Sequence, residues 1–136
     1  QILSFYKIFF KHNSLGSKLI TGDTYFIYNI LNQKIKKINS IKLNSEDGHP
    51  STRPGDNNLM LTDTYSDTKN KKKAKILLFD INKQIIILKE ELNSIEDYDN
   101  SPFRSDLHPR WSVDGKFFSV DTLDQGIRSS YVYRII

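Results

Sequence analysis

The chain has 136 residues, a length that allows one small domain with a modest core, and its 38% of hydrophobic residues favours a folded protein over a disordered one. Its formal net charge of +4 is mild, and no apolar run approaches the roughly 18–20 residues of a membrane-spanning helix. Cysteine is absent, which excludes disulfides, thiolate zinc sites, iron–sulfur clusters and cysteine nucleophiles. Because the chain begins with Gln1, we expect a piece of a longer protein or a processed chain.

The sequence predicts β-strands along most of its length. The first 13 residues fit a strand or a helix, and no later segment has the caps and periodicity of an amphipathic helix. Several short segments are rich in β-branched and aromatic residues, as strands are: residues 25–30, 34–38, 58–62, 75–81, 84–88, 117–120 and 130–135. Turn-forming residues separate them, at positions 32–33, 55–57, 81–83 and, most clearly, Asp114-Gly115. We therefore expect an all-β fold.

An internal repeat organises the second half of the chain. Residues 47–50 and 106–109 both read D-x-H-P, 59 positions apart, and residues 61–64 align with residues 119–122. Each unit contains a strand, a turn, a strand, a loop and another strand, and residues 84–88 add a fourth strand to the first unit. Because four antiparallel strands form one blade of a β-propeller, the repeat predicts propeller blades.

The chain is expected to hold about two blades and part of a third, a partial β-propeller. Residues 1–17 form an N-terminal segment with no assigned place, and residues 18–45 a partial blade. Residues 46–101 and 102–136 are the two blades that start with D-x-H-P. Since a propeller closes with roughly 4–8 blades, we expect the remaining blades to come from a longer parent chain or from other copies of this one.

The second unit resembles a known repeat. Residues 108–121 read H-P-R-W-S-V-D-G-K-F-F-S-V-D, which is similar to the PD40 repeat of TolB-like, WD40-like propellers, P-x-W-S-P-D-G-x-x-I-x-F, with Val113 in place of the usual proline. The phrases D-G-H-P-S, L-T-D-T-Y and D-L-H-P-R-W resemble the last blades of oligogalacturonate lyase-like propellers, a polysaccharide lyase family. This similarity covers about residues 18–136.

The resemblance implies a seven-bladed propeller whose central cavity holds a manganese-type ion. In that family the ion binds the uronate carboxylate while a histidine removes the C5 proton for β-elimination. His49 and His108 fall on two metal-ligand histidines of the family, whereas Phe103 and Asp106 stand where the lyases have a glutamine and a further histidine. The general-base histidine of the family lies in an earlier blade. The resemblance therefore supports a metal site more than it supports turnover.

The spacing of the D-x-H-P residues points to the same chemistry. Asp47 and His49 are two positions apart, as are Asp106 and His108, so each pair would share a face of an extended strand. If these strands are the innermost of their blades, the four side chains converge on the channel mouth. Two imidazoles and two carboxylates suit Mn²⁺, Fe²⁺ or Zn²⁺, which would act as a Lewis acid on a carboxylate-bearing sugar. The alternative is structural, with each carboxylate bonding an imidazole or capping a turn.

Arginines beside the repeated histidine are candidate substrate contacts. Arg104 and Arg110 flank His108, and a guanidinium binds a carboxylate in bidentate fashion. Arg104 is the preferred contact, since Arg110 also fits an inter-blade ion pair. Trp111 is expected to pack between blades rather than to stack on a sugar.

Other features are assigned structural roles. The equivalent Asp63 and Asp121 are expected to form hydrogen bonds within their blades, and His12 has no motif around it and is assigned to the surface. The basic run at residues 69–75 is expected to be a solvated loop, because acidic residues follow it and no single basic face emerges. We expect neither a nucleic-acid nor a membrane partner.

Three hypotheses for function follow. The first is the C-terminal piece of a metal-dependent, uronate-polysaccharide lyase-like propeller that takes uronate oligosaccharides, and the D-x-H-P repeat favours it. The second is a non-catalytic TolB-like propeller module that binds carbohydrate or protein at the same mouth. The missing lyase glutamine and base histidine favour that module. The third is a truncated product whose open sheet edges promote association. The cytoplasm and the periplasm both remain open.

Overall fold

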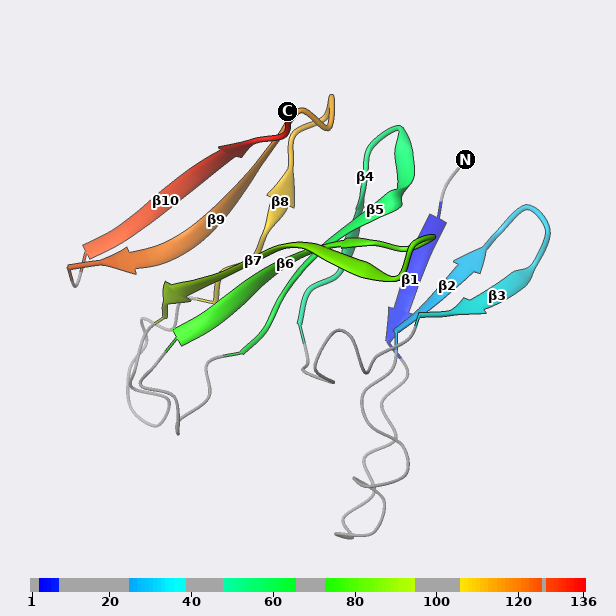
Figure 1. Ribbon diagram of the computed structural model, residues 1–136, viewed down its shortest axis with the longest axis horizontal. Coiled ribbons are helices and arrows are strands. Elements are labelled where there is room, and N and C mark those ends of the chain that lie inside the picture. The colour runs from blue at the N-terminus through cyan, green and yellow to red at the C-terminus, as the bar shows by residue number, and fades with distance from the viewer. Residues whose placement is uncertain (1–2, 8–24, 39–47, 66–72, 95–105, 126) are drawn as a thin grey trace, which may run out of the picture.

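The computed structural model describes residues 3–7, 25–38, 48–65, 73–94, 106–125 and 127–136 (Figure 1). In these residues every regular element is a β-strand and every strand pairing is antiparallel, so the predicted all-β fold is confirmed. No helix in this part of the chain has the length and apolar character needed to cross a bilayer.

The strands form three sheets, none of which closes on itself. The first has the order β1-β2-β3, with β1 at Leu3–Lys7, β2 at Tyr25–Asn29 and β3 at Lys34–Lys37. The second has the order β4-β5-β6-β7, with β4 at Ser51–Arg53, β5 at Asp56–Asp63, β6 at Lys73–Asp80 and β7 at Ile85–Asn93. The third has the order β10-β9-β8, with β8 at Arg110–Trp111, β9 at Phe117–Asp124 and β10 at Ile127–Arg134.

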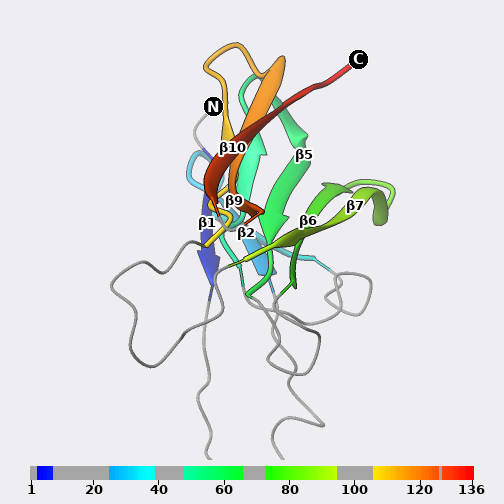
Figure 2. The same ribbon diagram turned by 90° about the vertical axis from the view of Figure 1, so that its left-hand side faces the viewer.

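The sheets follow one another in chain order across the molecule (Figure 1). Figure 2 views them from the side of the third sheet, with β9 and β10 in front. The second sheet is the four-stranded antiparallel meander expected for the first repeat unit, and the third supplies three strands in the same sequence of strand, turn and strand. In addition, β1 pairs with β2, which places Leu3–Lys7 in the same sheet as residues 25–37.

Apolar side chains fill the spaces on both faces of the second sheet. Because successive residues of a strand point to opposite faces, Leu77 and Phe79 of β6 face one cluster and Ile76 and Leu78 face the other. The first cluster joins the first and second sheets through Tyr25, Ile27, Ile38, Met60, Leu77, Phe79 and Ile81. The second joins the second and third sheets through Leu61, Ala74, Ile76, Leu78, Leu92, Leu107, Phe118 and Val120. Burial on two sides explains the uninterrupted apolar run of β6.

The predicted turns at residues 32–33, 81–83 and 114–115 are confirmed, whereas the turn predicted at residues 55–57 lies at residues 54–55, because β5 already begins at Asp56. Gly115 has a φ of +67°, the left-handed conformation that the Asp114-Gly115 hairpin requires. The Oδ1 atom of Asp114 accepts hydrogen bonds from Ser112 Oγ at 2.6 Å and from the backbone N–H of Lys116 at 3.0 Å. This turn joins β8 to β9 and so fixes the start of the third sheet.

The carboxylate of Asp80 organises the turn between β6 and β7. Asp80 is 5% exposed, and its Oδ1 accepts hydrogen bonds from Lys83 N at 2.8 Å, Asn82 N at 2.9 Å and Asn58 Nδ2 at 3.0 Å. These donors, that of Lys83 foremost, lower the pKa of the Asp80 carboxyl below its ordinary value. A lowered folded-state pKa stabilises the fold above the unfolded pKa of about 3.9, and this stabilisation is lost as the pH falls through the folded-state pKa.

We therefore expect Asp80→Asn to lower the thermal midpoint at pH 7 and to reduce its fall on acidification below about pH 4. Thermal melts followed by circular dichroism across this pH range measure both effects. Identical acid dependence in the variant and the wild type would show that Asp80 does not contribute.

Candidate metal centre

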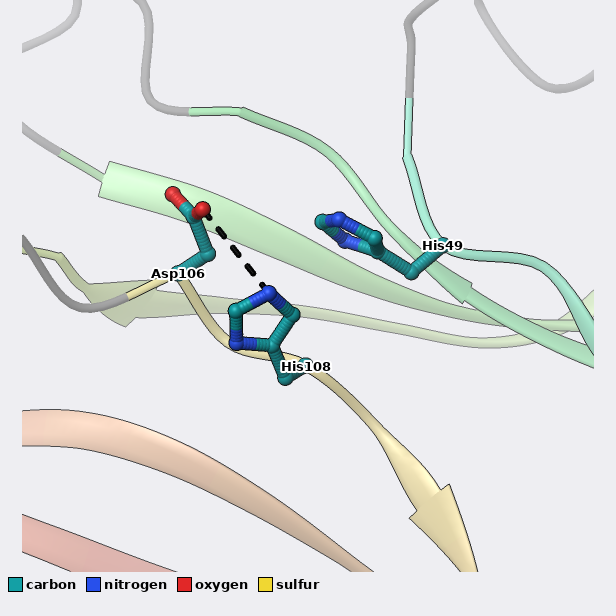
Figure 3. Close-up of side chains that lie close together, drawn as sticks. All are labelled: His49, Asp106 and His108. Atoms are coloured by element: carbon teal, nitrogen blue, oxygen red, sulfur yellow. Dashed lines mark ion pairs between the residues drawn. The ribbon is translucent and has the colours of Figure 1, made fainter.

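Two histidines lie at equivalent places on the segments that lead into the second and third sheets. His49 stands two residues before β4, and His108 stands two residues before β8. The segments that carry them bring the two rings close together, with their centroids 4.5 Å apart and their planes tilted by 59° (Figure 3). The sequence repeat thus brings together two imidazoles that are 59 positions apart.

Asp106 completes a cluster with the two histidines. One ligand atom from each of His49, Asp106 and His108 lies within 4.8 Å of the others. The carboxylate Oδ2 of Asp106 is 3.8 Å from Nε2 of His108 (Figure 3). His49 and Asp106 are half-buried and His108 is exposed, so the cluster is open to solvent on one side. An imidazole pair with a carboxylate is a donor set that divalent transition metals accept.

The segment around His108 differs from the expected extended strand. His108 has a φ of +39°, in the left-handed region, and β8 begins only at Arg110. The approach of Asp106 to His108 therefore comes from a local turn of the backbone rather than from the two-residue period of a strand. The intervening Leu107 is fully buried, and its carbonyl oxygen accepts a hydrogen bond from Asp121 N at 2.8 Å, which anchors the segment to β9.

Asp63, at the end of β5, contacts both histidines and is 1% exposed. Its Oδ1 accepts a hydrogen bond from His49 N at 2.7 Å and lies 3.0 Å from His49 Nδ1. Its Oδ2 accepts a hydrogen bond from His108 N at 3.1 Å. The sequence predicts that Asp63 forms bonds within its own blade; one of its bonds instead reaches the segment that leads into the third sheet.

Asp63 could be singled out from the sequence because Asp121 stands at the matching position of the second repeat unit. The two aspartates nevertheless have different partners in the structure. The equivalent Asp121 forms an ion pair with Arg110 and accepts a hydrogen bond from Ser130 Oγ at 2.9 Å. Its side chain therefore bonds an arginine and a serine of its own sheet. Sequence alone could not show that one of two matching aspartates bonds a histidine and the other an arginine.

Two further residues shape the surroundings of His49. A Cβ atom on Gly48 would lie 1.7 Å from the backbone oxygen of Asp63, so only glycine allows this close approach of the two segments. On the other side, Tyr65 Oη lies 3.4 Å from His49 Nε2, and the two rings meet edge to face with centroids 5.6 Å apart. Together with Asp63, these residues leave His49 little freedom.

The other residues that the sequence singled out do not join the cluster in the described part of the chain. Arg110 is exposed and pairs with Asp121 rather than standing unengaged beside His108. Trp111 packs edge to face on Phe118 at a centroid distance of 5.7 Å, next to the apolar cluster between the second and third sheets, as expected. The predicted ligand Asp47, the preferred arginine Arg104 and the surface histidine His12 lie outside the described residues.

Comparison with known proteins adds no relative: no family model, no curated protein and no solved structure matches the chain. The resemblance to lyase-like propellers rests on the sequence motifs quoted above. The cluster of His49, Asp106 and His108 is a feature of this chain's own geometry.

Proposed function

We propose that His49, Asp106 and His108 bind a divalent transition-metal ion, with Mn²⁺ as the ion that the motif resemblance implies. The observation that carries this proposal is the 4.8 Å cluster of their ligand atoms. Two imidazole nitrogens and one carboxylate oxygen match the preferences of Mn²⁺, Fe²⁺ and Zn²⁺, and an open side leaves room for further ligands. Asp47 remains a predicted additional ligand.

At the level of the whole protein, we propose a piece of a propeller that cleaves uronate oligosaccharides by β-elimination. When bound, the ion would supply Lewis acidity toward a uronate carboxylate. The chain's own part is to hold the ion with residues from two repeat units and, through Arg104, to orient the carboxylate. The general base would come from another blade, because the family motif for it is not present in this sequence.

One contact favours a second candidate, a non-catalytic TolB-like propeller module that binds carbohydrate or protein. Arg110, for which the sequence left open a carboxylate contact or an inter-blade ion pair, is engaged by Asp121 of its own sheet. A guanidinium that is already paired offers less to an incoming carboxylate than an unpaired one, since the existing ion pair must first break. Both candidates contain the metal site, but only the lyase-like candidate cleaves its substrate.

The metal site is tested by calorimetric titration of the chain with Mn²⁺. We expect wild-type binding at micromolar or tighter dissociation constants, and a loss of at least about 100-fold in the His49→Ala, His108→Ala double variant, because two of three ligands are removed. His12→Ala, which removes the remaining histidine, serves as the matched control and should bind as the wild type does. Circular dichroism establishes that each protein is folded.

A folded wild type that does not bind Mn²⁺, Fe²⁺ or Zn²⁺ would overturn the metal site. Equal binding by the wild type and the double variant would place the ion elsewhere. If the ion binds as expected, incubation of the full-length parent protein, which would supply the general base, with oligogalacturonate separates the two candidates. Ultraviolet absorbance from an unsaturated product supports the lyase, and binding without product supports the module.

A further inference from the structure

We propose that Asp63 is the positioning residue of this site: it fixes the ring of His49 so that Nε2 is the metal-binding atom, and it holds the backbone of His108 in place. This inference rests on the proposed metal site and adds to it a residue that does not touch the ion. It is carried by three contacts of one buried carboxylate.

The first step concerns the tautomer of His49. An ionised carboxylate only accepts hydrogen bonds, so the ring atom that faces it must be a donor. Nδ1 of His49 lies 3.0 Å from Oδ1 and 3.1 Å from Oδ2 of Asp63, which places the ring proton on Nδ1. The lone pair then resides on Nε2, on the side of the ring away from Asp63, where its neighbour in the metal-free protein is Tyr65 Oη at 3.4 Å. An ion bound at Nε2 would take the place of this hydroxyl contact. A carboxylate that orients a ligating imidazole in this way also raises its basicity.

The second step concerns the backbone. The same carboxylate accepts the N–H of His49 at 2.7 Å and the N–H of His108 at 3.1 Å, although these residues lead into different sheets. His108 has a φ of +39°, a conformation that residues other than glycine rarely adopt. The bond from its N–H to Asp63 helps to hold this conformation, and the conformation in turn brings its ring to 4.5 Å from that of His49.

The third step concerns the chemical identity of residue 63. Orienting the His49 ring and accepting the His108 N–H require a carboxylate rather than an amide of the same shape. Both oxygens of Asp63 accept from N–H groups, and the side chain is 1% exposed, so water does not substitute for a lost partner. In Asp63→Asn one of the two positions becomes an NH₂ donor and faces another donor. Either the His49 ring or the His108 backbone must then change its arrangement.

Asp121→Asn is the matched control for Asp63→Asn. Asp121 occupies the equivalent position in the second unit, and the substitution is the same chemical change, but its side chain bonds Arg110 and Ser130 rather than a histidine. We expect Asp63→Asn to weaken Mn²⁺ binding by about 10–100-fold, the range typical of residues that orient metal ligands. Asp121→Asn should change it by less than about threefold.

The tautomer is measured separately, in metal-free protein, from the ¹⁵N chemical shifts of the histidine rings at a pH where they are neutral. We expect His49 to carry its proton on Nδ1 in the wild type and in Asp121→Asn, and to lose this preference in Asp63→Asn. A wild-type His49 that carries its proton on Nε2 overturns the proposal, and this outcome decides the matter even if Asp63→Asn fails to fold. Unchanged Mn²⁺ affinity in a folded Asp63→Asn also overturns it.

The two measurements separate this inference from the metal site itself. A wild type that binds no ion but shows an Nδ1–H His49 dependent on Asp63 overturns the metal function and supports the orienting role of the carboxylate. A wild type that binds Mn²⁺ with the same affinity and the same tautomer as Asp63→Asn supports the metal function and overturns the positioning role.

Discussion

Gly48→Ala should destabilise the protein by about 3 kcal/mol or more, at the upper end of what overpacking costs. The added Cβ would lie 1.7 Å from the backbone oxygen of Asp63 and 2.9 Å from Thr62 Oγ1. A backbone atom cannot rotate away as a flexible side chain does, so either the end of β5 or the segment before β4 must move. Because His49 and Asp63 lie on these two segments, the shift should also weaken Mn²⁺ binding.

Gly55→Ala is the control for this prediction. Gly55 has a φ of +77°, but no atom lies within 4 Å of the place that an alanine Cβ would take, so the substitution costs backbone strain alone, about 1 kcal/mol. Urea unfolding followed by circular dichroism gives both free energies. A cost at Gly48 no larger than that at Gly55 would show that the two segments separate easily and that the close approach is not needed.

Phe118→Ala should cost about 3–5 kcal/mol, as truncation of a buried phenylalanine does. Phe118 is 1% exposed and lies in the cluster between the second and third sheets. Its ring stacks on Tyr133 with a centroid distance of 4.7 Å and meets Trp111 edge to face at 5.7 Å. Alanine would leave a cavity and remove both aromatic contacts. Since small proteins are stable by about 5–15 kcal/mol, a large share of the stability would be lost.

The neighbouring phenylalanine gives the comparison. Phe117 points to the opposite face of β9 and is 39% exposed, so Phe117→Ala should cost less than about 1.5 kcal/mol. Urea unfolding of the two variants side by side measures the difference. Equal costs would mean that the packing of β9 against the second sheet contributes little to stability.

The strands could be predicted because local patterns carry most of the information about them. The apolar run of β6 and the Asp114-Gly115 turn can both be located from residue type alone. The far end of β7 cannot: the predicted strand ends at Leu88, whereas the observed strand continues to Asn93. Residues 89–91 are charged and carry no strand signal, and they join the sheet because β6 offers an edge to pair with, with Lys75 opposite Glu91.

Part of the candidate site could also be predicted from the sequence. The repeat indicated that His49 and His108 occupy equivalent positions, and the structure brings their rings together with Asp106. The contact of Asp63 with both histidines could not be predicted, because it depends on how two sheets pack. The left-handed backbone of His108 has no local cause in its sequence, which has the pattern of a strand; it is supported by bonds to residues far along the chain.

The cluster lies on the seam between two repeat units, and this has a consequence for how such a site can be inherited. His49 and Asp63 come from one unit, and Asp106 and His108 from the next. Recombination that exchanged a single unit would separate Asp63 from the His108 N–H that it accepts, although each sheet would keep its own hydrogen-bond ladder. The smallest transferable piece that carries the described cluster is therefore an adjoining pair of units.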